Sequence, residues 1–268
     1  MFRAAFAASL MLSAAPALAC GPDDDCTVGA RTYRIVMPEG HDGVTKVPVI
    51  AYAHGYKGTA AGVMRNGSLR KLASDLGAAL LAFNAVDGSW ILPNHPRQMD
   101  SDGAGEFTYV DAVLDDAAAR FALDEARVMA TGFSSGGMLI WNLACARSDR
   151  FAGFAPISGT FWLEPPDTCQ GPVASIVHIH GDNDRTVPLE GRAIGPTKQG
   201  EVDEALAMYG AYGSFGAPAQ ATYGDLACEE QNNPQGDMLS FCLFEGGHSF
   251  RTEYVRFAFE KFEEAGRL

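Results

Sequence analysis

The chain is short of positive charge. It has 20 Lys and Arg residues against 33 Asp and Glu residues, which gives a formal net charge of −13 at pH 7. An acidic surface repels the phosphates of nucleic acids, so the composition argues against a nucleic-acid-binding protein. We therefore expect no nucleic-acid partner.

Long hydrophobic runs are also scarce, and none after the first residues could span a bilayer. The start, "MFRAAFAASLMLSAAPALAC", combines Arg3 with an apolar run and ends in Ala17-Leu18-Ala19 before Cys20. This pattern is typical of a signal peptide over residues 1–19, cleaved after Ala19, and it predicts a secreted or periplasmic protein. Lipidation of Cys20 is the alternative, although Ala17 stands where a lipoprotein signal usually has Leu. Without that lipid we expect no membrane association.

The sequence has six cysteines but no Cys-x-x-Cys pair and no spacing typical of zinc ligands. An even number of cysteines in an exported protein indicates disulfides. Six cysteines allow about 15 pairings, and short separations favour the sequential one. The expected bonds are Cys20–Cys26, Cys145–Cys169 and Cys228–Cys242.

Linkers, repeats and low-complexity segments are missing, which predicts one domain over residues 20–268. Hydrophobic residues make up 47% of the sequence, enough for one large core. Apolar runs such as "VPVIAYAHG", "ARVMATGF" and "ASIVHIHG" alternate with amphipathic segments. Helices are expected near 60–76, 106–122, after Ser134, near 200–212 and near 251–265, with a hairpin at 219–244. This alternation predicts an α/β fold with a mostly parallel central sheet and helices on both faces.

One segment, "ATGFSSGGM", has two serines between glycines. The pattern Gly-x-Ser-x-Gly fits only with Ser134 at its centre, between Gly132 and Gly136. A nucleophile on a tight strand-to-helix turn needs such small neighbours, and the predicted elements supply that context. The free N–H groups at the start of the following helix would face the reaction centre. We therefore predict that Ser134 is a nucleophile.

A serine nucleophile needs an imidazole base and a carboxylate that orients it. With this motif the chain order is serine, acid, histidine, and only His248 in "FEGGHSF" follows the candidate acids. The predicted acid is Asp184 in "HIHGDNDRTVP", just beyond a strand end. Asp182 is expected to stabilise the turn, Glu190 is a weaker candidate, and His54 is expected to be structural.

Two further roles can be assigned from position. The oxyanion of the reaction needs two backbone N–H donors, predicted at Ser135 and at Tyr56 in the loop after "VPVIAYAHG". Aromatic residues on loops at strand ends are candidates for substrate contact, although ordinary packing is an equal alternative for the two tryptophans. These candidates are Tyr56, Trp90, Trp162 and Phe250.

Two other classes of protein remain open. His178, His180 and Asp182 have the spacing of a metal-binding His-x-His-x-Asp motif, which would make the chain a zinc-dependent hydrolase. The histidine that usually follows is missing, because position 183 is Asn. A binding protein with an inactive hydrolase fold is disfavoured because every triad position is filled. We therefore expect no cofactor and no metal.

Taken together, the segments around Ser134, Asp184 and His248 resemble the secreted esterase family of polyhydroxybutyrate depolymerases, which is related to feruloyl and acetylxylan esterases. The likeness includes "CTVGARTYRIVMPEG", "DGSW" and "LACARSDRFAGFAPISGTFW" and covers most of the chain after the signal. It implies an α/β-hydrolase fold, a Ser-His-Asp triad and hydrolysis of carboxylic esters. Many relatives have Trp shortly after the histidine, where this chain has Phe250, and Asn or Ala at position 135, where it has Ser135. Both differences bear on the substrate.

The residues after His248 read as one amphipathic helix, with no linker or polymer-binding module behind it. Together with the acidic surface, this predicts a preference for soluble short-chain esters, including hydroxybutyrate oligomers and small aromatic esters, over crystalline polyester. Feruloyl or acetylxylan esterase is the alternative. The sequence has no signal for or against a mobile lid within 190–240.

Overall fold

The computed structural model describes residues 20–268, so the predicted signal peptide over residues 1–19 lies outside the described residues. Its centre is a ten-stranded sheet in the order β1-β2-β4-β3-β5-β6-β7-β12-β11-β10. The middle strands run parallel: β4 (Ala79–Phe83), β3 (Val47–Ala53), β5 (Leu123–Phe133), β6 (Gly153–Ile157), β7 (Ile176–Gly181) and β12 (Met238–Phe244). The edge strands are antiparallel: β1 (Cys26–Val28), β2 (Arg31–Val36), β11 (Leu226–Asn232) and β10 (Ala219–Tyr223).

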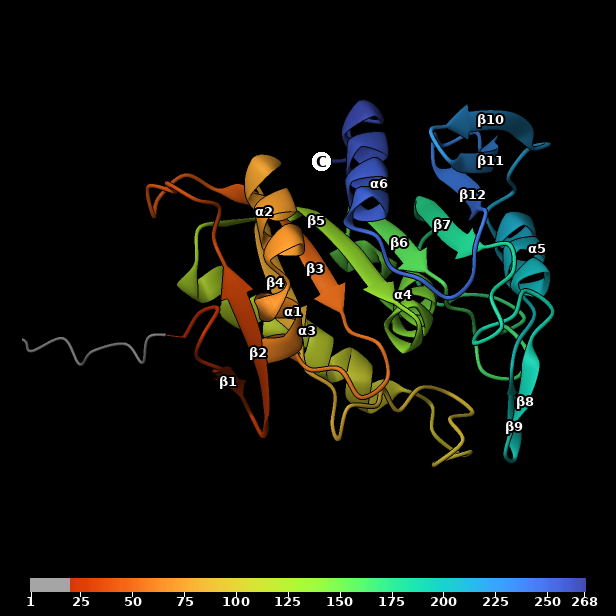
Figure 1. Cartoon of the computed structure of the whole chain (residues 1–268), viewed down its shortest axis with the longest axis horizontal. Coiled ribbons are helices and arrows are strands. Elements are labelled where there is room, and N and C mark those ends of the chain that lie inside the picture. The colour runs from red at the N-terminus through yellow and green to blue at the C-terminus, as the bar shows by residue number, and fades with distance from the viewer. Residues whose placement is uncertain (1–19) are drawn as a thin grey trace, which may run out of the picture.

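Helices cover both faces of this sheet (Figure 1). One face is covered by α3 (Ala104–Arg120), α4 (Ser135–Ala146) and α5 (Val202–Tyr212). The other face is covered by α1 (Ala60–Arg65), α2 (Gly67–Asp75) and α6 (Thr252–Glu264). The predicted three-layer α/β architecture is therefore confirmed.

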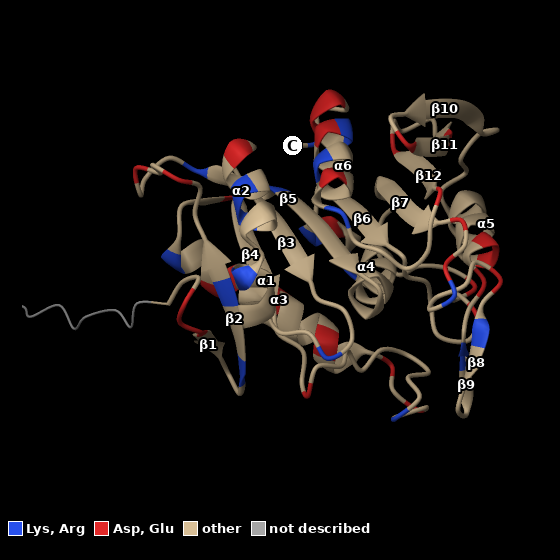
Figure 2. Ribbon diagram, in the orientation of Figure 1, with Lys and Arg blue, Asp and Glu red and all other residues tan. Residues whose placement is uncertain are grey.

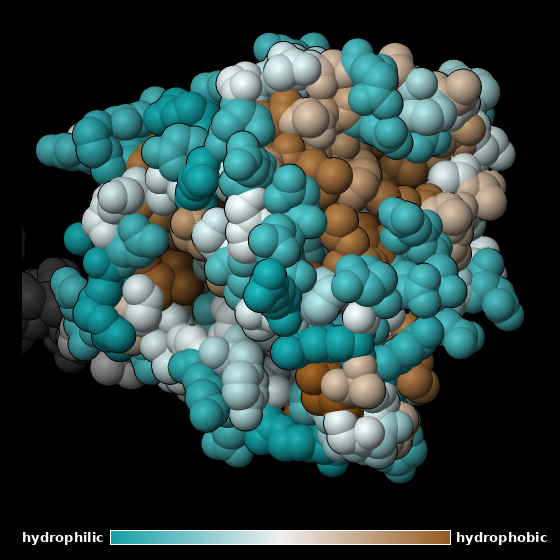
Figure 3. All heavy atoms as spheres, turned by 45° about the vertical axis from the view of Figure 1, so that its right-hand side comes forward, coloured by the Kyte–Doolittle hydropathy of each residue, from teal (hydrophilic) through white to brown (hydrophobic). Residues whose placement is uncertain are grey.

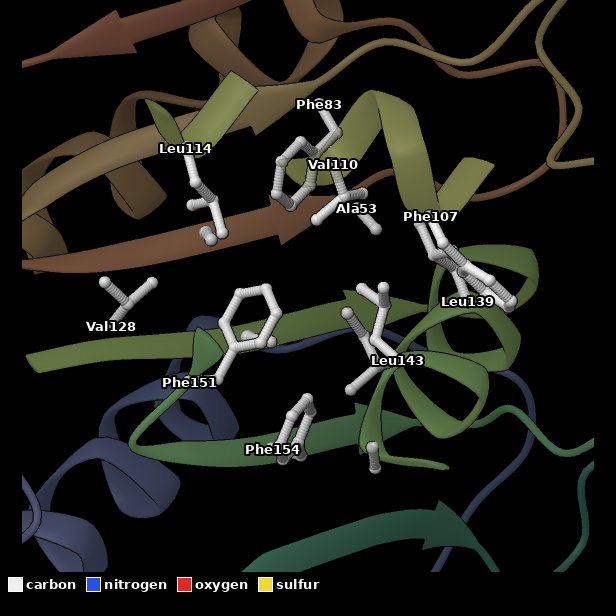
Figure 4. Close-up of a cluster of buried hydrophobic side chains, with 14 of the residues drawn as sticks. Ala53, Phe83, Phe107, Val110, Leu114, Val128, Leu139, Leu143, Phe151 and Phe154 are labelled. Carbon is white, nitrogen blue, oxygen red and sulfur yellow. The ribbon is translucent and has the colours of Figure 1, made fainter. Parts of the chain in front are cut away.

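Helical periodicity produces the core on the α3 and α4 face. Val110 and Leu114 of α3 and Leu139 and Leu143 of α4 are buried, and they belong to one hydrophobic cluster with Phe151 and with Phe154 of β6 (Figure 4). Each large apolar side chain removed from water contributes on the order of 1.5–3 kcal/mol. This packing fixes α4, and with it the turn that precedes α4, against the sheet.

The predicted helix at 60–76 is in fact two helices. Asn66 ends α1 in an extended conformation (φ −73°, ψ 93°), and its side chain accepts a hydrogen bond of 3.1 Å from the Leu69 N–H. Asn is among the best residues for capping a helix N-terminus, so it starts α2 at the point where it interrupts α1.

The predicted hairpin at 219–244 is also more extended than expected. It forms three strands, and the last of them, β12, pairs in parallel with β7, so this segment completes the central sheet. A second small sheet of β8 (Arg192–Ile194) and β9 (Thr197–Gln199) was not predicted.

The six cysteines form the three disulfides predicted from their separations. The pairs are Cys20–Cys26, Cys145–Cys169 and Cys228–Cys242. Cys228 and Cys242 also face each other in the register of β11 and β12. They therefore link two neighbouring strands of the sheet.

The exterior is mostly polar. On the face shown in Figure 3, brown apolar patches lie between larger hydrophilic areas. Within residues 20–268 no helix is both long enough and apolar enough to cross a membrane.

Candidate active site

Ser134 lies at the sharp turn between β5 and α4. Its backbone has φ 59° and ψ −121°, a conformation that non-glycine residues rarely adopt. Two hydrogen bonds hold it there: the Ser134 N–H donates to the Ile157 carbonyl (2.9 Å), and the Ser134 carbonyl accepts from the Met138 N–H (3.0 Å). The local geometry is that of a strained strand-to-helix turn, the context that the Gly-x-Ser-x-Gly motif requires.

The glycines on either side of Ser134 are required by close backbone contacts. A Cβ on Gly132 would lie 2.8 Å from the Ala53 carbonyl oxygen, and a Cβ on Gly136 would lie 2.0 Å from the same atom. No side chain fits at such distances, so the turn can be built only with glycine at these positions. The predicted register, with Ser134 rather than Ser135 at the centre, agrees with this geometry.

The topology opens a crevice at this point. β3 and β5 are parallel neighbours, and the chain leaves β3 toward β4 on one side and β5 toward β6 on the other. In open α/β sheets, ligands bind outside the carboxyl ends of the strands at such a switch point. The loop after β3 therefore lies beside Ser134, and a Cβ on Gly55 would be 3.5 Å from the Ser134 Cβ.

Two backbone amides next to Ser134 are free. The N–H groups of Tyr56 and Ser135 donate no hydrogen bond within the described part of the chain. Both residues line a hollow of about 300 Å³ that also contains Ser134. Free amides at such a hollow can stabilise a developing oxyanion.

His248 and Asp184, 64 residues apart, are joined by a short hydrogen bond. The distance between His248 Nδ1 and the Asp184 Oδ2 oxygen is 2.6 Å. The His248 ring also packs on Phe133, the residue before Ser134, with the ring centroids 4.6 Å apart. The predicted acid and base therefore meet beside the strand end that carries the predicted nucleophile.

The surroundings of Asp184 keep it ionised. Burial raises its pKa, but hydrogen bonds from His180, His248 and the N–H groups of Val187 and Thr186 together lower that pKa below the ordinary value for Asp. Because an ionised carboxylate can only accept, the proton on His248 lies at Nδ1. This tautomer leaves Nε2 of His248 with a lone pair that can take a proton.

The other residues considered for the triad have structural roles. Asp182 is exposed, and its Oδ1 accepts from the Gly246 N–H (2.9 Å), so it stabilises the turn as expected. His54 is buried: its Nδ1 donates to the carbonyl of the next residue (2.8 Å), and its Nε2 accepts from the Ala85 N–H (3.1 Å). Burial lowers the pKa of His54, so its ring stays neutral. Glu190 is an exposed residue beyond β7.

The histidines of β7 form a buried hydrogen-bonded chain. The Trp141 indole N–H donates to His178 Nδ1 (3.0 Å), so the His178 proton lies on Nε2, which donates to His180 Nδ1 (2.9 Å). The remaining His180 nitrogen, Nε2, donates to the Val187 carbonyl (2.8 Å) and lies 3.4 Å from the Asp184 Oδ2 oxygen. The chain thus ends at the carboxylate that holds His248.

This arrangement does not support the zinc alternative. Every ring nitrogen of His178 and His180 is engaged in a hydrogen bond, and Asp182 lies past the end of β7 with its carboxylate turned to Gly246. Among residues 20–268, no three or more His, Cys, Asp or Glu side chains are placed to hold a metal ion. The spacing of His178, His180 and Asp182 therefore does not bring the three side chains together at one metal site.

The predicted substrate-contacting aromatics divide into two groups. Tyr56 and Trp162 line the hollow beside Ser134, and Tyr56 is 60% exposed. Phe250 instead packs against Tyr52 and Phe133, at a separate hollow, so it is not positioned to contact a ligand at Ser134.

The prediction for Trp90 is wrong. Its side chain is fully buried, lies beside the tilted ring of His54 with the ring centroids 4.9 Å apart, and donates a 2.8 Å hydrogen bond to the His54 carbonyl. Trp90 therefore packs against the loop after β3 and has no exposed surface for a ligand.

Several residues of the hollow could not be assigned from the sequence. They come from the loop before α3 and from the β8–β9 hairpin: His95, Arg97, Arg192 and Gln199. The Gly195-Pro196 turn was the only sequence signal for that hairpin, and two strands of three residues are too short for a periodic pattern.

Comparison with known proteins agrees with this geometry. No family model matches the chain. "Putative esterase NocK" of Nocardia uniformis subsp. tsuyamanensis is 28% identical over 62% of the chain, and the match spans 48% of that relative. Feruloyl esterase C of Emericella nidulans is 27% identical over 70% of the chain and 69% of its own length.

Among solved structures, acetyl xylan esterase from Aspergillus awamori superposes with a TM-score of 0.60. The match covers 93% of the chain and 97% of that structure at 13% sequence identity, which shows a common fold. The chain therefore has the α/β-hydrolase fold found in esterases, and its sequence is similar to those of esterases, among them feruloyl esterase C.

Proposed function

We propose that the protein is a serine esterase that hydrolyses carboxylic esters. Ser134 is the nucleophile, His248 is the general base and Asp184 orients the base. The observation that carries this proposal is the 2.6 Å hydrogen bond between buried, ionised Asp184 and His248, whose ring packs on the residue next to Ser134.

The reaction follows from these positions in two steps. Ser134 Oγ attacks the ester carbonyl carbon while His248 Nε2 takes its proton, and the N–H groups of Tyr56 and Ser135 stabilise the oxyanion. His248 then gives the proton to the departing alkoxide, which leaves an acyl-enzyme. In the second step His248 takes a proton from water, the resulting hydroxide attacks the acyl carbon, and Ser134 recovers its proton as the acid departs.

The size of the hollow favours small substrates. Its volume of about 300 Å³ is at the lower end of the range for ligand pockets, and apolar Met138, Trp162 and Ile194 form part of its lining. We infer that soluble short-chain or oligomeric hydroxyalkanoate esters react in preference to crystalline polyester. Hydrolysis of feruloyl or acetylxylan esters is the second candidate, because relatives and structural neighbours carry those names.

We also propose that residues 20–268 form a single catalytic domain of an exported protein. Three disulfides support export, because such bonds persist in oxidising compartments. The signal peptide at residues 1–19 remains part of this proposal.

A substrate panel tests the proposed function. It compares 4-nitrophenyl butyrate, the 3-hydroxybutyrate trimer, methyl ferulate, acetylated xylan and a polyester film, with and without EDTA or a serine-reactive phosphonate. We expect the soluble esters to react fastest, the phosphonate to abolish turnover and EDTA to leave it unchanged. Rapid clearing of the film with little action on soluble esters would refute the preference, and loss of activity in EDTA would refute the serine mechanism.

A further inference from the structure

The hollow beside Ser134 has an unusual charge for this molecule. Its lining includes Arg97 and Arg192 but no Asp or Glu residue, although acidic residues outnumber basic ones by 33 to 20 in the whole chain. The two arginines come from separate segments, the loop before α3 and the start of β8. Figure 2 shows basic residues on both segments.

Neither arginine is neutralised by the protein. Over residues 20–268, no carboxylate oxygen lies within 4.0 Å of the nitrogens of Arg97 or Arg192. In contrast, Arg147 and Arg150 both pair with Asp111. Two uncompensated guanidinium groups at one hollow are a favourable environment for a bound anion.

Arg192 is also held in position. Its Nε donates a 2.9 Å hydrogen bond to Oε1 of Gln199, the residue directly opposite in the β8–β9 register. Gln199 is buried and pairs through its backbone with Trp162, another residue of the hollow. Because Nε carries this contact, the two terminal nitrogens remain for a ligand, in the planar geometry that matches a carboxylate.

Arg97 lies next to His95, another residue of the hollow. The Arg97 N–H donates to His95 Nδ1 (3.2 Å), and His95 Nε2 is 3.0 Å from the Ser89 hydroxyl. Burial, and then the nearby charge of Arg97, lower the pKa of His95 below its ordinary value. The ring is therefore neutral at pH 7, which leaves the two arginines as the charged groups of the lining.

We propose that Arg97 and Arg192 select esters that carry a free carboxylate, with the carboxylate at the guanidinium groups and the scissile carbonyl at Ser134. This inference rests on the proposed esterase function and specifies its substrate class. The open end of a short hydroxyacid oligomer has this chemistry, because each linear chain ends in one carboxylate. A neutral ester of the same length lacks the anchoring group.

A matched pair of substrates tests the proposal: the 3-hydroxybutyrate trimer as the free acid and as its terminal primary amide. We expect kcat/KM to be about tenfold higher for the acid. Ion pairs at exposed positions are weak, so Arg97→Gln and Arg192→Gln should each lower the acid-to-amide ratio about threefold, and the double variant should bring it close to one. Raising the salt concentration should also lower the ratio.

Arg70→Gln is the control, because Arg70 is exposed on α2, makes no ion pair within residues 20–268 and lines a different hollow. It removes the same charge from the whole molecule and should keep the wild-type ratio. Equal rates for acid and amide in the wild type, or an equal loss of ratio in Arg70→Gln, would overturn the proposal.

A binding measurement separates this inference from the esterase proposal. Calorimetry with Ser134→Ala should show tighter binding of the trimer acid than of the amide, and Arg97→Gln together with Arg192→Gln in that background should remove the difference. If 4-nitrophenyl butyrate is hydrolysed but the acid and amide bind alike, only the substrate inference fails. If no ester is hydrolysed, the esterase proposal fails and the calorimetry still decides whether the hollow binds carboxylates.

Discussion

At the scale of single residues, Asp184 is a buried carboxylate whose position is fixed by the hydrogen-bond donors around it. Its Oδ1 accepts the N–H groups of Thr186 and Val187, and its Oδ2 faces His180 and His248. These donors suit an ionised carboxylate, which only accepts, and an amide in its place would turn an NH₂ group toward some of them.

Asp184→Asn should therefore lower kcat by about 10³–10⁴-fold, because the imidazole loses the partner that fixes its tautomer. The control is Asp182→Asn, two residues away, whose carboxylate accepts only from the Gly246 N–H, and it should keep kcat within about threefold. Ester hydrolysis by purified variants measures both. A larger loss in Asp182→Asn than in Asp184→Asn would show that the acid has been misassigned.

The sequence was sufficient to propose the triad because order along the chain and spacing in short motifs carry that information. It was not sufficient for Trp90, because the burial of Trp90 comes with contacts to His54, which lies 36 residues earlier in the chain. Arg97 and Arg192 were missed for a similar reason: the residues that line a hollow come from segments with no common pattern.

At the scale of elements, the β5–turn–α4 unit is set by backbone contacts with β3. Gly136 lies so near Ala53 that even one added methyl group would have to displace a central strand or the start of α4. The elements with strong periodicity, such as α3 and the central strands, could be predicted. The break at Asn66 could not, because one good capping residue outweighed a helical pattern on both sides.

Gly136→Ala should lower the free energy of unfolding by about 3 kcal/mol, since the added carbon overlaps the Ala53 carbonyl. The matched control is Gly105→Ala in α3, where an added Cβ meets no atom within 4 Å. It should raise the free energy of unfolding by about 0.5–1 kcal/mol through higher helix propensity. Urea unfolding curves measure both changes, and similar effects of the two substitutions would contradict the close contact at Gly136.

At the scale of the whole molecule, stability depends on histidines that are neutral in the folded state. His178 is fully buried, and burial, then the neighbouring His180, hold its pKa well below the ordinary value. An unfolded chain has no such constraint, so its histidine binds a proton as the pH falls below about 6.5. The unfolded state then binds more protons than the folded state, so the free energy of unfolding decreases as the pH is lowered.

Below pH 6, each such histidine lowers the free energy of unfolding by up to about 1.4 kcal/mol per pH unit. His178→Gln removes the titrating group and should reduce that slope by about this amount, whatever it does to stability at pH 7.5. Urea unfolding between pH 7.5 and 5 measures the slopes, and equal slopes for wild type and His178→Gln would contradict a neutral buried ring.

The central claim, that Ser134 forms a covalent intermediate, is tested most directly by mass spectrometry after treatment with a fluorophosphonate. We expect one phosphonyl group per molecule, mapped to Ser134, no labelling of Ser134→Ala, and normal labelling of Ser135→Ala, since residue 135 contributes only its backbone N–H. Turnover of Ser134→Ala should fall by orders of magnitude with little change in Tm. A label on Ser135, or labelling and full activity in Ser134→Ala, would contradict the account.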